Sequence, residues 1–430
     1  MAASLAVAAS IAPAEVRAAD GEWVFNGTVQ GAGYTRMAYD SARNRLLGFD
    51  SHYNPFEHTY YVTTYALSFG PPVTYDTLAT IGSPPTATWG APTVYDSARD
   101  RLLVHDGSSV FQLELGLPVP HWSIVSVAGA SPPVRTEHAG IYDPVGDRLI
   151  VFGGLGNSPD PFSGRWNDVW ALNLDDSPAW SEITPATSAY PGGVANHAAL
   201  YDPVRQRMVV YGGSTQSGGP TSVQDIGNVA ALTLDGSPSW MLLSTSGFQC
   251  SDPGVTYDPF RDRLVAFGGR NRNVGYVYDH FAAFSFVGGI WRTLAPTGDS
   301  PAARFGHGMG WSPDLDEMVM YGVGYDVWLY DPSQALAVPP AGTLAFGLRA
   351  VAPITREAFV ELECTLPNAE DATVELFDVA GRNLATRRLS PAPTGTSRIR
   401  LVPSSTAPGI TFARLTQGAR VAQAKSIRLR

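Results

Sequence analysis

A hairpin phrase recurs six times along the chain. Each regular copy runs Tyr-Asp, three turn residues, one more polar residue, Arg and then aliphatic residues, as in Tyr95-Asp96-Ser-Ala-Arg-Asp-Arg101-Leu-Leu. The copies begin at Tyr39, Tyr95, Tyr142, Tyr201, Tyr257 and, in degenerate form, Trp311. Their starts are 56, 47, 59, 56 and 54 residues apart by subtraction. A period near 50 predicts a chain of repeated supersecondary units that bury a core only against one another.

The third copy shows what one unit contains. His138–Phe152 has the pattern of two strands joined by an Asp-Pro turn, because Asp can bond its own backbone and Pro presets φ. Gly153-Gly154 follows, and after a variable loop Asn167–Leu174 and Trp180–Ile183 predict the third and fourth strands. Four antiparallel strands per unit, repeated around an axis, predict a β-propeller.

The composition supports an all-β chain. It includes 44 Gly and 34 Pro with only 16% charged residues, and no long window has helical periodicity. The first 342 residues hold 32 acidic and 17 basic side chains by count, so we expect no nucleic-acid partner, which would need clustered Lys and Arg. Cys250 and Cys364 are too few for a disulfide framework or a thiolate metal site, and no metal or cofactor is expected.

The unit resembles the Kelch repeat, in which Gly-Gly follows the second strand and an aromatic opens the fourth. The doublets are Gly153-Gly154, Gly212-Gly213 and Gly268-Gly269, and the fourth-strand aromatics are Tyr75, Trp122, Trp180, Trp240 and Trp291. The Arg-x-x-His that the family often carries before its first strand is found at Arg135/His138 and Arg304/His307. The resemblance covers residues 22–334 and implies a six-bladed Kelch-type β-propeller.

The sixth unit has no fourth strand of its own. Its first three predicted strands are His307–Trp311, Met318–Tyr321 and Asp326–Tyr330, after which the chain enters a Pro-rich segment. At the other end, Glu22–Phe25 has the pattern of a fourth strand without a blade. We predict that this strand, near Trp23, completes the sixth blade, which closes the ring and removes its open edges.

Two terminal segments lie outside the predicted propeller. Residues 1–20 include a short apolar run, Leu5–Ala14, that resembles a secretory signal and is too short to span a bilayer. No other segment is apolar enough for a transmembrane helix. After a linker at residues 335–342, residues 343–430 contain alternating runs such as Phe359–Leu366 that predict a small Ig-like β-sandwich.

The sandwich resembles the C-terminal sorting domain of proteins exported by bacterial type IX secretion. The matching residues are Asp378, Gly381, Arg382, Pro408, Gly409 and Phe412. The resemblance implies a bacterial protein that is secreted or held at the cell surface, with the secretion machinery as a partner. Similar sandwiches also serve as flagellar hook-cap and cell-surface modules, so anchoring is an alternative to sorting.

Several reactive side chains have a structural explanation in a propeller. His138, His197 and His307 lie near the predicted axis, where they would line the channel as ligands or pack between blades; packing is favoured. The Tyr-Asp pairs are expected to start turns, and the Trp series to pack between blades. Galactose oxidase shares the Kelch propeller, but its copper radical site needs a cysteine linked to a tyrosine, and no matching motif surrounds Cys250. No Ser-His-Asp pattern, zincin helix or nucleotide loop is present.

The connections between strands two and three do not repeat, and four of them are long. They share one face of the propeller with the connections between blades, and function usually lies on loops held by a rigid scaffold. We expect a ligand to bind through residues of these loops: His52, Tyr53, Phe56, His58, Phe162, Arg165, Trp166, Asp225, Arg270, Arg272 and Tyr276.

The sequence therefore predicts a secreted or cell-surface binding protein that recognises an extracellular glycan or protein through this face. The alternative is a secreted carbohydrate-active enzyme on the same face, which would need two carboxylates a few ångströms apart. The acids available to such an enzyme are Glu57, Asp160, Asp225 and Asp279. Binding is favoured over catalysis because no catalytic motif is present.

Overall fold

The structure is a computed structural model that describes residues 20–428 apart from short gaps. The gaps are residues 29–35, 55–58, 70–72, 86–89, 157–163, 186–191, 217–222, 323–325, 333–346, 351–353, 356–358, 367, 379–381, 391, 393–394, 405–408 and 419. The chain divides into two compact units, Met1–Ala335 and Leu336–Arg430. The described residues form strands and no α-helix, so none of them belongs to a helix that could cross a membrane.

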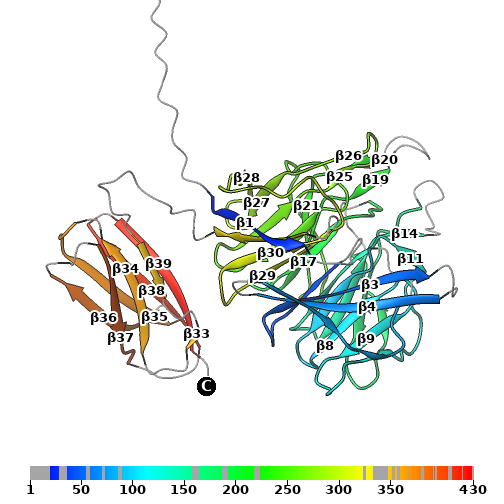
Figure 1. Cartoon of the computed structure of the whole chain (residues 1–430), viewed down its shortest axis with the longest axis horizontal. Helices are drawn as coiled ribbons and strands as arrows, with labels where there is room; N and C mark the ends of the chain where they lie inside the picture. Colours follow the sequence, from blue (N-terminus) through cyan, green and yellow to red (C-terminus); the bar gives the residue numbers. More distant parts are fainter. Residues whose placement is uncertain are drawn as a thin grey trace, which may run out of the picture. The chain divides into compact units, whose positions relative to one another are not determined.

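Six sheets, each built on four antiparallel strands, form the blades of the first unit (Figure 1). Blade 1 is β2 (Ala38–Asp40), β3 (Arg45–Asn54), β4 (Thr59–Ser68) and β5 (Thr74–Leu78); blade 2 is β7 (Thr93–Asp96), β8 (Arg101–His105), β9 (Val110–Glu114) and β10 (His121–Ile124), with β6 (Ile81–Gly82) alongside β10; blade 3 is β12 (Ala139–Asp143), β13 (Arg148–Phe152), β15 (Val169–Asn173) and β16 (Trp180–Glu182). Blade 4 is β17 (Ala198–Asp202), β18 (Arg207–Tyr211), β21 (Val229–Thr233) and β22 (Trp240–Ser244); blade 5 is β23 (Gly254–Asp258), β24 (Arg263–Phe267), β27 (Phe281–Ser285) and β28 (Ile290–Thr293); blade 6 is β29 (Gly308–Ser312), β30 (Glu317–Tyr321), β31 (Asp326–Asp331) and β1 (Glu22–Thr28).

The blades close into a ring around a channel. The first strands of successive blades contact one another in the order β2, β7, β12, β17, β23, β29 and back to β2. One cluster of buried apolar side chains fills each of the six interfaces between neighbouring blades. The fold is thus an all-β, six-bladed propeller, and its core consists of six layers rather than one centre.

The sixth blade is completed from the other end of the unit. β1 pairs antiparallel with β31, with Trp23 opposite Tyr330 and Phe25 opposite Trp328. Trp23 is 3% exposed and packs against Phe267 and Phe281 of blade 5. The fourth-strand aromatics of the other blades occupy the same place in their interfaces, which confirms that the Trp series packs between blades.

The recurring phrase forms the tight turn between strands one and two. In blade 4, the buried Asp202 carboxylate accepts hydrogen bonds from the backbone N–H groups of Val204 and Arg205 at 3.1 Å and from Arg207 Nε at 2.9 Å. The same contacts recur at Asp40, Asp96 and Asp258, which confirms that the Tyr-Asp pairs start turns. The sixth residue of each copy has φ between +46° and +55°, which explains why Asn, Asp or Gln stands there.

The phrase also ties neighbouring blades together. Its fifth residue, when Arg, makes a two-pronged ion pair with the sixth residue of the next copy, as Arg205 does with Asp262 at 2.6 and 2.9 Å. The other such pairs are Arg43–Asp100, Arg99–Asp147 and Arg261–Asp316. Gly146 faces Gln206 between blades 3 and 4, and Leu315 and Asn44 hold these positions between blades 6 and 1, so the described residues make no such pair at these two interfaces.

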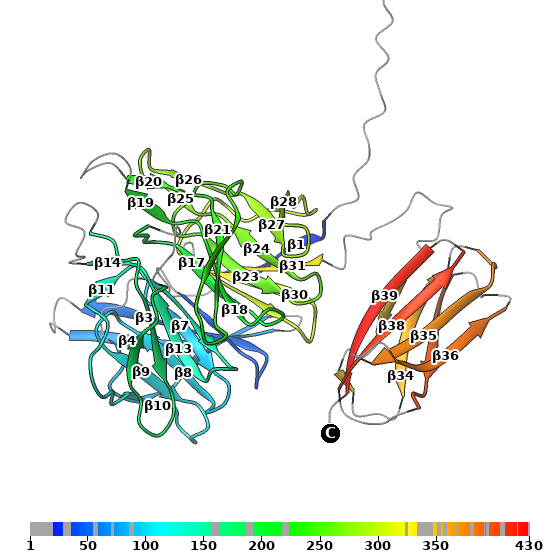
Figure 2. The same ribbon diagram turned by 180° about the vertical axis from the view of Figure 1, so that it is seen from behind.

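The second unit is a sandwich of two sheets, drawn in orange and red in Figures 1 and 2. One sheet has the order β32 (Gly347–Ala350), β34 (Val360–Leu366), β37 (Gly395–Leu401); the other has the order β33 (Ile354–Thr355), β39 (Arg420–Arg428), β38 (Gly409–Gln417), β35 (Ala372–Asp378), β36 (Asn383–Leu389). Alternate residues of β34 and β35 are buried between the sheets. Cys364 lies in this core, Cys250 is buried in the propeller, and both are free thiols.

Replacing the turn carboxylate should destabilise the propeller selectively. In D202N the amide cannot accept hydrogen bonds on both sides as the carboxylate does, so the buried Arg207 loses its counterion, and the free energy of unfolding should fall by about 3 kcal/mol. Urea unfolding followed by tryptophan fluorescence measures this change, because all ten tryptophans precede residue 335. D176N, which changes an exposed aspartate, is the matched control. Equal urea midpoints for D202N and D176N would contradict the structural role of the Asp202 carboxylate.

The interface between blades 3 and 4 can be given the ion pair that it lacks. The double variant G146R/Q206D should raise the free energy of unfolding by about 0.5–1 kcal/mol, because the pair is part-exposed like its counterparts. Each single substitution should contribute less, and a double-mutant cycle in urea measures the coupling. Additive effects of the two substitutions would mean that the new side chains do not meet.

Candidate functional site

In the five phrases for which the structure describes it, the residue five places before the aromatic has an unusual backbone. Its φ is +68° at Gly90, +55° at Glu137, +58° at Asn196, +55° at Asp252 and +66° at Gly306. Such a left-handed conformation costs a non-glycine residue roughly 1 kcal/mol. The backbone N–H groups of Asn196, Asp252 and Gly306 each donate to the carbonyl of the equivalent residue one blade earlier, at 2.8–2.9 Å. A chain of hydrogen bonds thus follows the rim of the channel and holds these residues in place.

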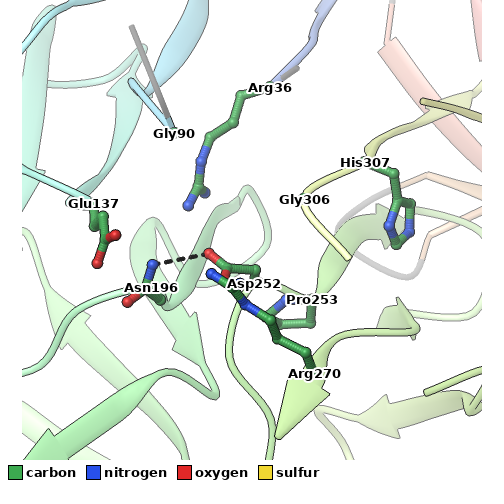
Figure 3. Close-up of a pocket in the computed structure, with 9 residues that line it drawn as sticks. All are labelled: Arg36, Gly90, Glu137, Asn196, Asp252, Pro253, Arg270, Gly306 and His307. Atoms are coloured by element: carbon green, nitrogen blue, oxygen red, sulfur yellow. Dashed lines mark hydrogen bonds and ion pairs between the residues drawn. The ribbon is translucent and has the colours of Figure 1, made fainter. Parts of the chain in front are cut away.

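Side chains from this rim meet arginines at a cavity in the mouth of the channel (Figure 3). The cavity has a volume of about 110 Å³ and is lined by Arg36, Gly90, Glu137, Asn196, Asp252, Pro253, Arg270, Gly306 and His307, so that every blade contributes. Figure 3 shows the Arg36 guanidinium pointing toward Asn196 and Asp252, with Glu137 to one side. A second cavity, of about 80 Å³, shares Arg36 and His307 and is lined mainly by first-strand residues.

Both carboxylates at the mouth are held by arginines from one connection. The Asp252 carboxylate accepts from Asn196 Nδ2 at 3.0 Å and from Arg270 Nε at 2.9 Å. Arg272 Nη1 donates to Glu137 Oε2 at 3.2 Å and also contacts Asn196 Oδ1. Arg270 and Arg272 both follow the second strand of blade 5, so this connection is fastened to the rims of blades 3, 4 and 5.

Arg36 enters from blade 1 and crosses the channel. Its Nη2 donates to the backbone carbonyl of His197 in blade 4 at 3.2 Å. No carboxylate of the described residues lies within ion-pairing distance of its guanidinium. Burial lowers the pKa of Arg36, and the attraction of Asp252 and Glu137 only partly opposes that effect.

The long connections predicted as loops are hairpins in three blades. β3 and β4 pair as far as Asn54 opposite Thr59, β19 (Ser214–Gln216) pairs with β20 (Val223–Asp225), and β25 (Arg270–Asn271) pairs with β26 (Tyr276–Val277). In blade 3, β14 (Leu155–Gly156) pairs instead with β11 (Arg135–Thr136) from the connection that precedes the blade. Backbone pairing therefore fixes the described parts of these connections.

The structure separates the predicted ligand-binding residues into two described groups. Arg270 and Arg272 lie at the mouth, and Tyr276 is 60% exposed at the tip of the same hairpin. Arg165, Trp166 and Asp225 are buried: Arg165 Nε donates to Ser214 O at 3.0 Å, Trp166 lies against Arg135, and Asp225 accepts from Ser251 Oγ and from the Arg272 N–H. This second group links loops of different blades to one another and does not face solvent.

The remaining predicted residues lie where side chains are not described. His52 and Tyr53 are within strand β3, whose backbone alone is described at that point. Phe56, His58 and Phe162 lie outside the described residues, as do Glu57 and Asp160. Their part in binding stays a prediction.

Comparison with known proteins agrees with this architecture. A family model described as the KLHDC2/KLHL20/DRC7 Kelch-repeats domain matches residues 104–323, about half of the chain. The chain belongs to the Kelch-repeat family. Mouse multiple epidermal growth factor-like domains protein 8 is 30% identical over 239 residues, which are 52% of this chain and only 8% of that protein.

Two solved structures are similar at low sequence identity. The structure of YjhT has a TM-score of 0.43 and 17% identity, over 55% of this chain and 73% of that chain. PorZ, an essential bacterial surface component of the type-IX secretion system of Porphyromonas gingivalis, has a TM-score of 0.43 and 10% identity, over 94% of this chain and 60% of that chain.

The histidines of the Kelch units pack between blades. His197 lies edge-on to Phe152 and His307 edge-on to Phe267, in each case against the preceding blade. His138 Nε2 forms a 2.8 Å hydrogen bond with His105 Nδ1. His307 also lines both cavities, so it alone of the three expected candidates combines packing with access to the channel.

A buried cysteine and tyrosine meet in this Kelch propeller. The Cys250 thiol lies 3.7 Å from the Tyr211 hydroxyl, and burial raises the pKa of Cys250 to about 12. Within the part of the chain that the structure describes, no three His, Cys, Asp or Glu side chains are grouped so that they could hold a metal ion. The expectation that the propeller holds no copper radical site stays a prediction.

Sequence reasoning missed Arg36, Glu137, Asn196 and Asp252. A signal was available for three of them: the same offset from the phrase holds glycine in two units, which indicates a left-handed position, and polar side chains in three others. Arg36 gave no such signal, because the equivalent residues of other blades are small or Pro.

Acid should destabilise the propeller before its carboxylates titrate. Burial lowers the pKa of His197 and of His307 to about 3, and that of His105 to about 4, whereas an unfolded histidine titrates near pH ~6.5. The unfolded chain therefore binds protons first, so stability is full above pH ~6.5 and falls below it, by up to about 1.4 kcal/mol per pH unit for each histidine.

Urea unfolding at pH 7.0, 6.0 and 5.0, followed by tryptophan fluorescence, measures this loss. H307Q should reduce the slope of unfolding free energy against pH by the contribution of one histidine. H121Q is the control, since the His121 side chain is exposed to water in the folded state. A wild-type unfolding free energy that did not change between pH 7.0 and 5.0 would refute the role of the buried histidines in acid destabilisation.

Proposed function

We propose that this chain is an exported binding protein whose loop face, centred on the mouth of the channel, holds a partner protein. Kelch domains mediate protein binding, which favours a protein over a glycan as the ligand. The observation that carries the proposal is the attachment of the blade 5 hairpin to the rim through Arg270 and Arg272. Such a surface is ordered before it meets its partner, so little entropy is lost on binding.

The exposed tip of this hairpin supports the same function. Val274 in the turn is 74% exposed, and Tyr276, which pairs with Asn271, is 60% exposed; both lie close in the hairpin to the ion-paired Arg270 and Arg272. Tyrosine contributes large contact areas with few rotatable bonds and is enriched among the residues that dominate binding energy. Exposed apolar side chains held beside ion-paired arginines suit recognition of a protein surface.

Export and sorting are part of the proposal. It rests on the signal-like segment at residues 1–20 and on the resemblance of the sandwich to type IX sorting domains. The turn of that resemblance is closed by Asp378, whose carboxylate accepts from the Arg382 N–H at 2.9 Å and from Arg382 Nε at 2.6 Å. The secretion machinery would then be the partner of the sandwich, and an extracellular protein the partner of the propeller.

The enzyme alternative has weaker support. Of its four candidate acids the structure describes two: Asp225 is buried with both carboxylate oxygens bonded, and Asp279 is exposed. At the mouth, Glu137 and Asp252 are each bonded to an arginine. A glycosidase uses two carboxyl groups that reach the scissile bond, whereas these two carboxylates are engaged by arginine side chains. A glycan ligand remains the second candidate for binding.

A matched pair of variants on one blade tests the loop face. Y276S should weaken capture of the partner at least about tenfold, ~1.4 kcal/mol, because it removes an exposed aromatic from the proposed interface. V287S changes an 82% exposed apolar residue on the opposite face of blade 5 and should leave capture unchanged. The full chain serves as bait for proteins of the culture medium, with affinity measured for the captured partner.

Two outcomes would overturn the proposal. Equal loss of capture in both variants would place the interface elsewhere. A glycan array that captured the wild type, combined with a medium from which no protein was captured, would replace the protein partner with a glycan.

A further inference from the structure

The channel mouth carries more basic than acidic side chains, although the propeller as a whole is acidic. The first 342 residues hold 32 acidic and 17 basic side chains by count. Among the described residues at the mouth, however, three arginines, Arg36, Arg270 and Arg272, stand against two carboxylates, Glu137 and Asp252. A locally positive site on an acidic body focuses attraction for anions on one point.

The excess positive charge can be assigned to one side chain. Arg270 is paired with Asp252, and Arg272 with Glu137. Arg36 has one hydrogen bond among the described residues, to the carbonyl of His197, although a guanidinium has five N–H donors. The Arg36 side chain is part-buried, and partial removal of a charge from water without a counterion is costly; burial lowers the pKa of Arg36 accordingly. The side chain nevertheless lines both cavities.

We propose that the channel mouth is an anion subsite in which Arg36 binds one carboxylate, supplied by an acidic side chain of the partner protein. The planar fork of a guanidinium matches a carboxylate in a two-pronged geometry, and donors of Arg36 remain for it. The cavity of about 110 Å³ accommodates a carboxylate with a short stem rather than a chain of sugar rings. This inference rests on the proposed function, because it assumes that the partner is a protein.

The position of the subsite also explains the neighbouring contacts. Arg270 and Arg272 neutralise Asp252 and Glu137, which would otherwise repel an incoming carboxylate. Arg36 is anchored through Nη2 to blade 4, so its guanidinium is held over the cavity before a ligand arrives. Among the described arginines at the mouth, Arg36 is therefore the one without a carboxylate partner and the one available to an anion.

Small probes test the subsite without the partner. Ligand-detected NMR at constant ionic strength compares N-acetyl-glutamic acid amide with its neutral isostere N-acetyl-glutamine amide. The wild-type full chain should bind the acid at least about tenfold better than the isostere, and R36Q should lose that preference. R349Q, an exposed arginine of the sandwich, is the control for loss of one positive charge.

A stability readout guards against a misfolded variant. R36Q removes a part-buried charge that has no carboxylate partner among the described residues, so its urea midpoint should equal or exceed that of the wild type. The acid probe should raise the midpoint of the wild type and of R349Q, and leave that of R36Q unchanged. Should R36Q prove unfolded, R36K keeps the charge without the fork and should retain only part of the preference.

Each remaining outcome counts against the inference. Equal binding of the acid to wild type and R36Q would place the anion elsewhere, and no preference for the acid would remove the subsite. Tighter Arg36-dependent binding of galacturonate than of the glutamate probe would assign the site to an acidic glycan. A captured partner that binds R36Q normally would refute the subsite and leave the proposed function standing. Probe binding through Arg36, with no protein captured from the medium, would support the subsite and refute the proposed protein-binding function.

Discussion

Burial of both faces of every blade is the constraint on which the propeller depends. In the second strand of blade 3, Leu149 and Val151 pack toward blade 2, while Ile150 and Phe152 pack toward blade 4. A blade is therefore stable only between two neighbours, because each exposed face would forfeit about 25 cal/mol per Å² of apolar surface. An open row would leave two such faces. Pairing of β1 with β31 completes blade 6, and the ring then buries every face.

Polar contacts divide the same ring into two halves. Two-pronged Arg–Asp pairs join blades 1, 2 and 3 and, separately, blades 4, 5 and 6. Between the halves, Arg148 donates to the carbonyl of Leu234 on one side and Ser312 to Asn44 on the other. The contacts that cross the channel, Arg36 to His197 and Arg272 to Glu137, also run between the halves. Residues that line the mouth thus contribute to the cohesion of the ring.

The fold could be predicted from the sequence because the phrase does the same work in every copy. Asp202 and Asp258 make the same turn contacts, and Trp122 and Trp240 pack in equivalent interfaces. The site could be predicted only in part. Arg270, Arg272 and Tyr276 were found because their connection is long, whereas Arg36 faces the rim only through ring closure, which brings blade 1 opposite blade 4. The hairpin form of the connections also depends on pairing between segments that carry no alternating pattern.

The left-handed backbone positions along the rim support a functional role for the channel mouth. Glycine would meet the backbone requirement at least cost, and it does so at Gly90 and Gly306. Asn196 tolerates the conformation comparatively well, but Glu137 has no such tendency and bears the steric cost in full. Packing gives no reason for that cost, since among the described residues the carboxylate of Glu137 bonds to Arg272 and lines the cavity. The side chain of Glu137 contributes nothing to the core. Its strained backbone is explained if its charge helps to order the surface on which a partner binds.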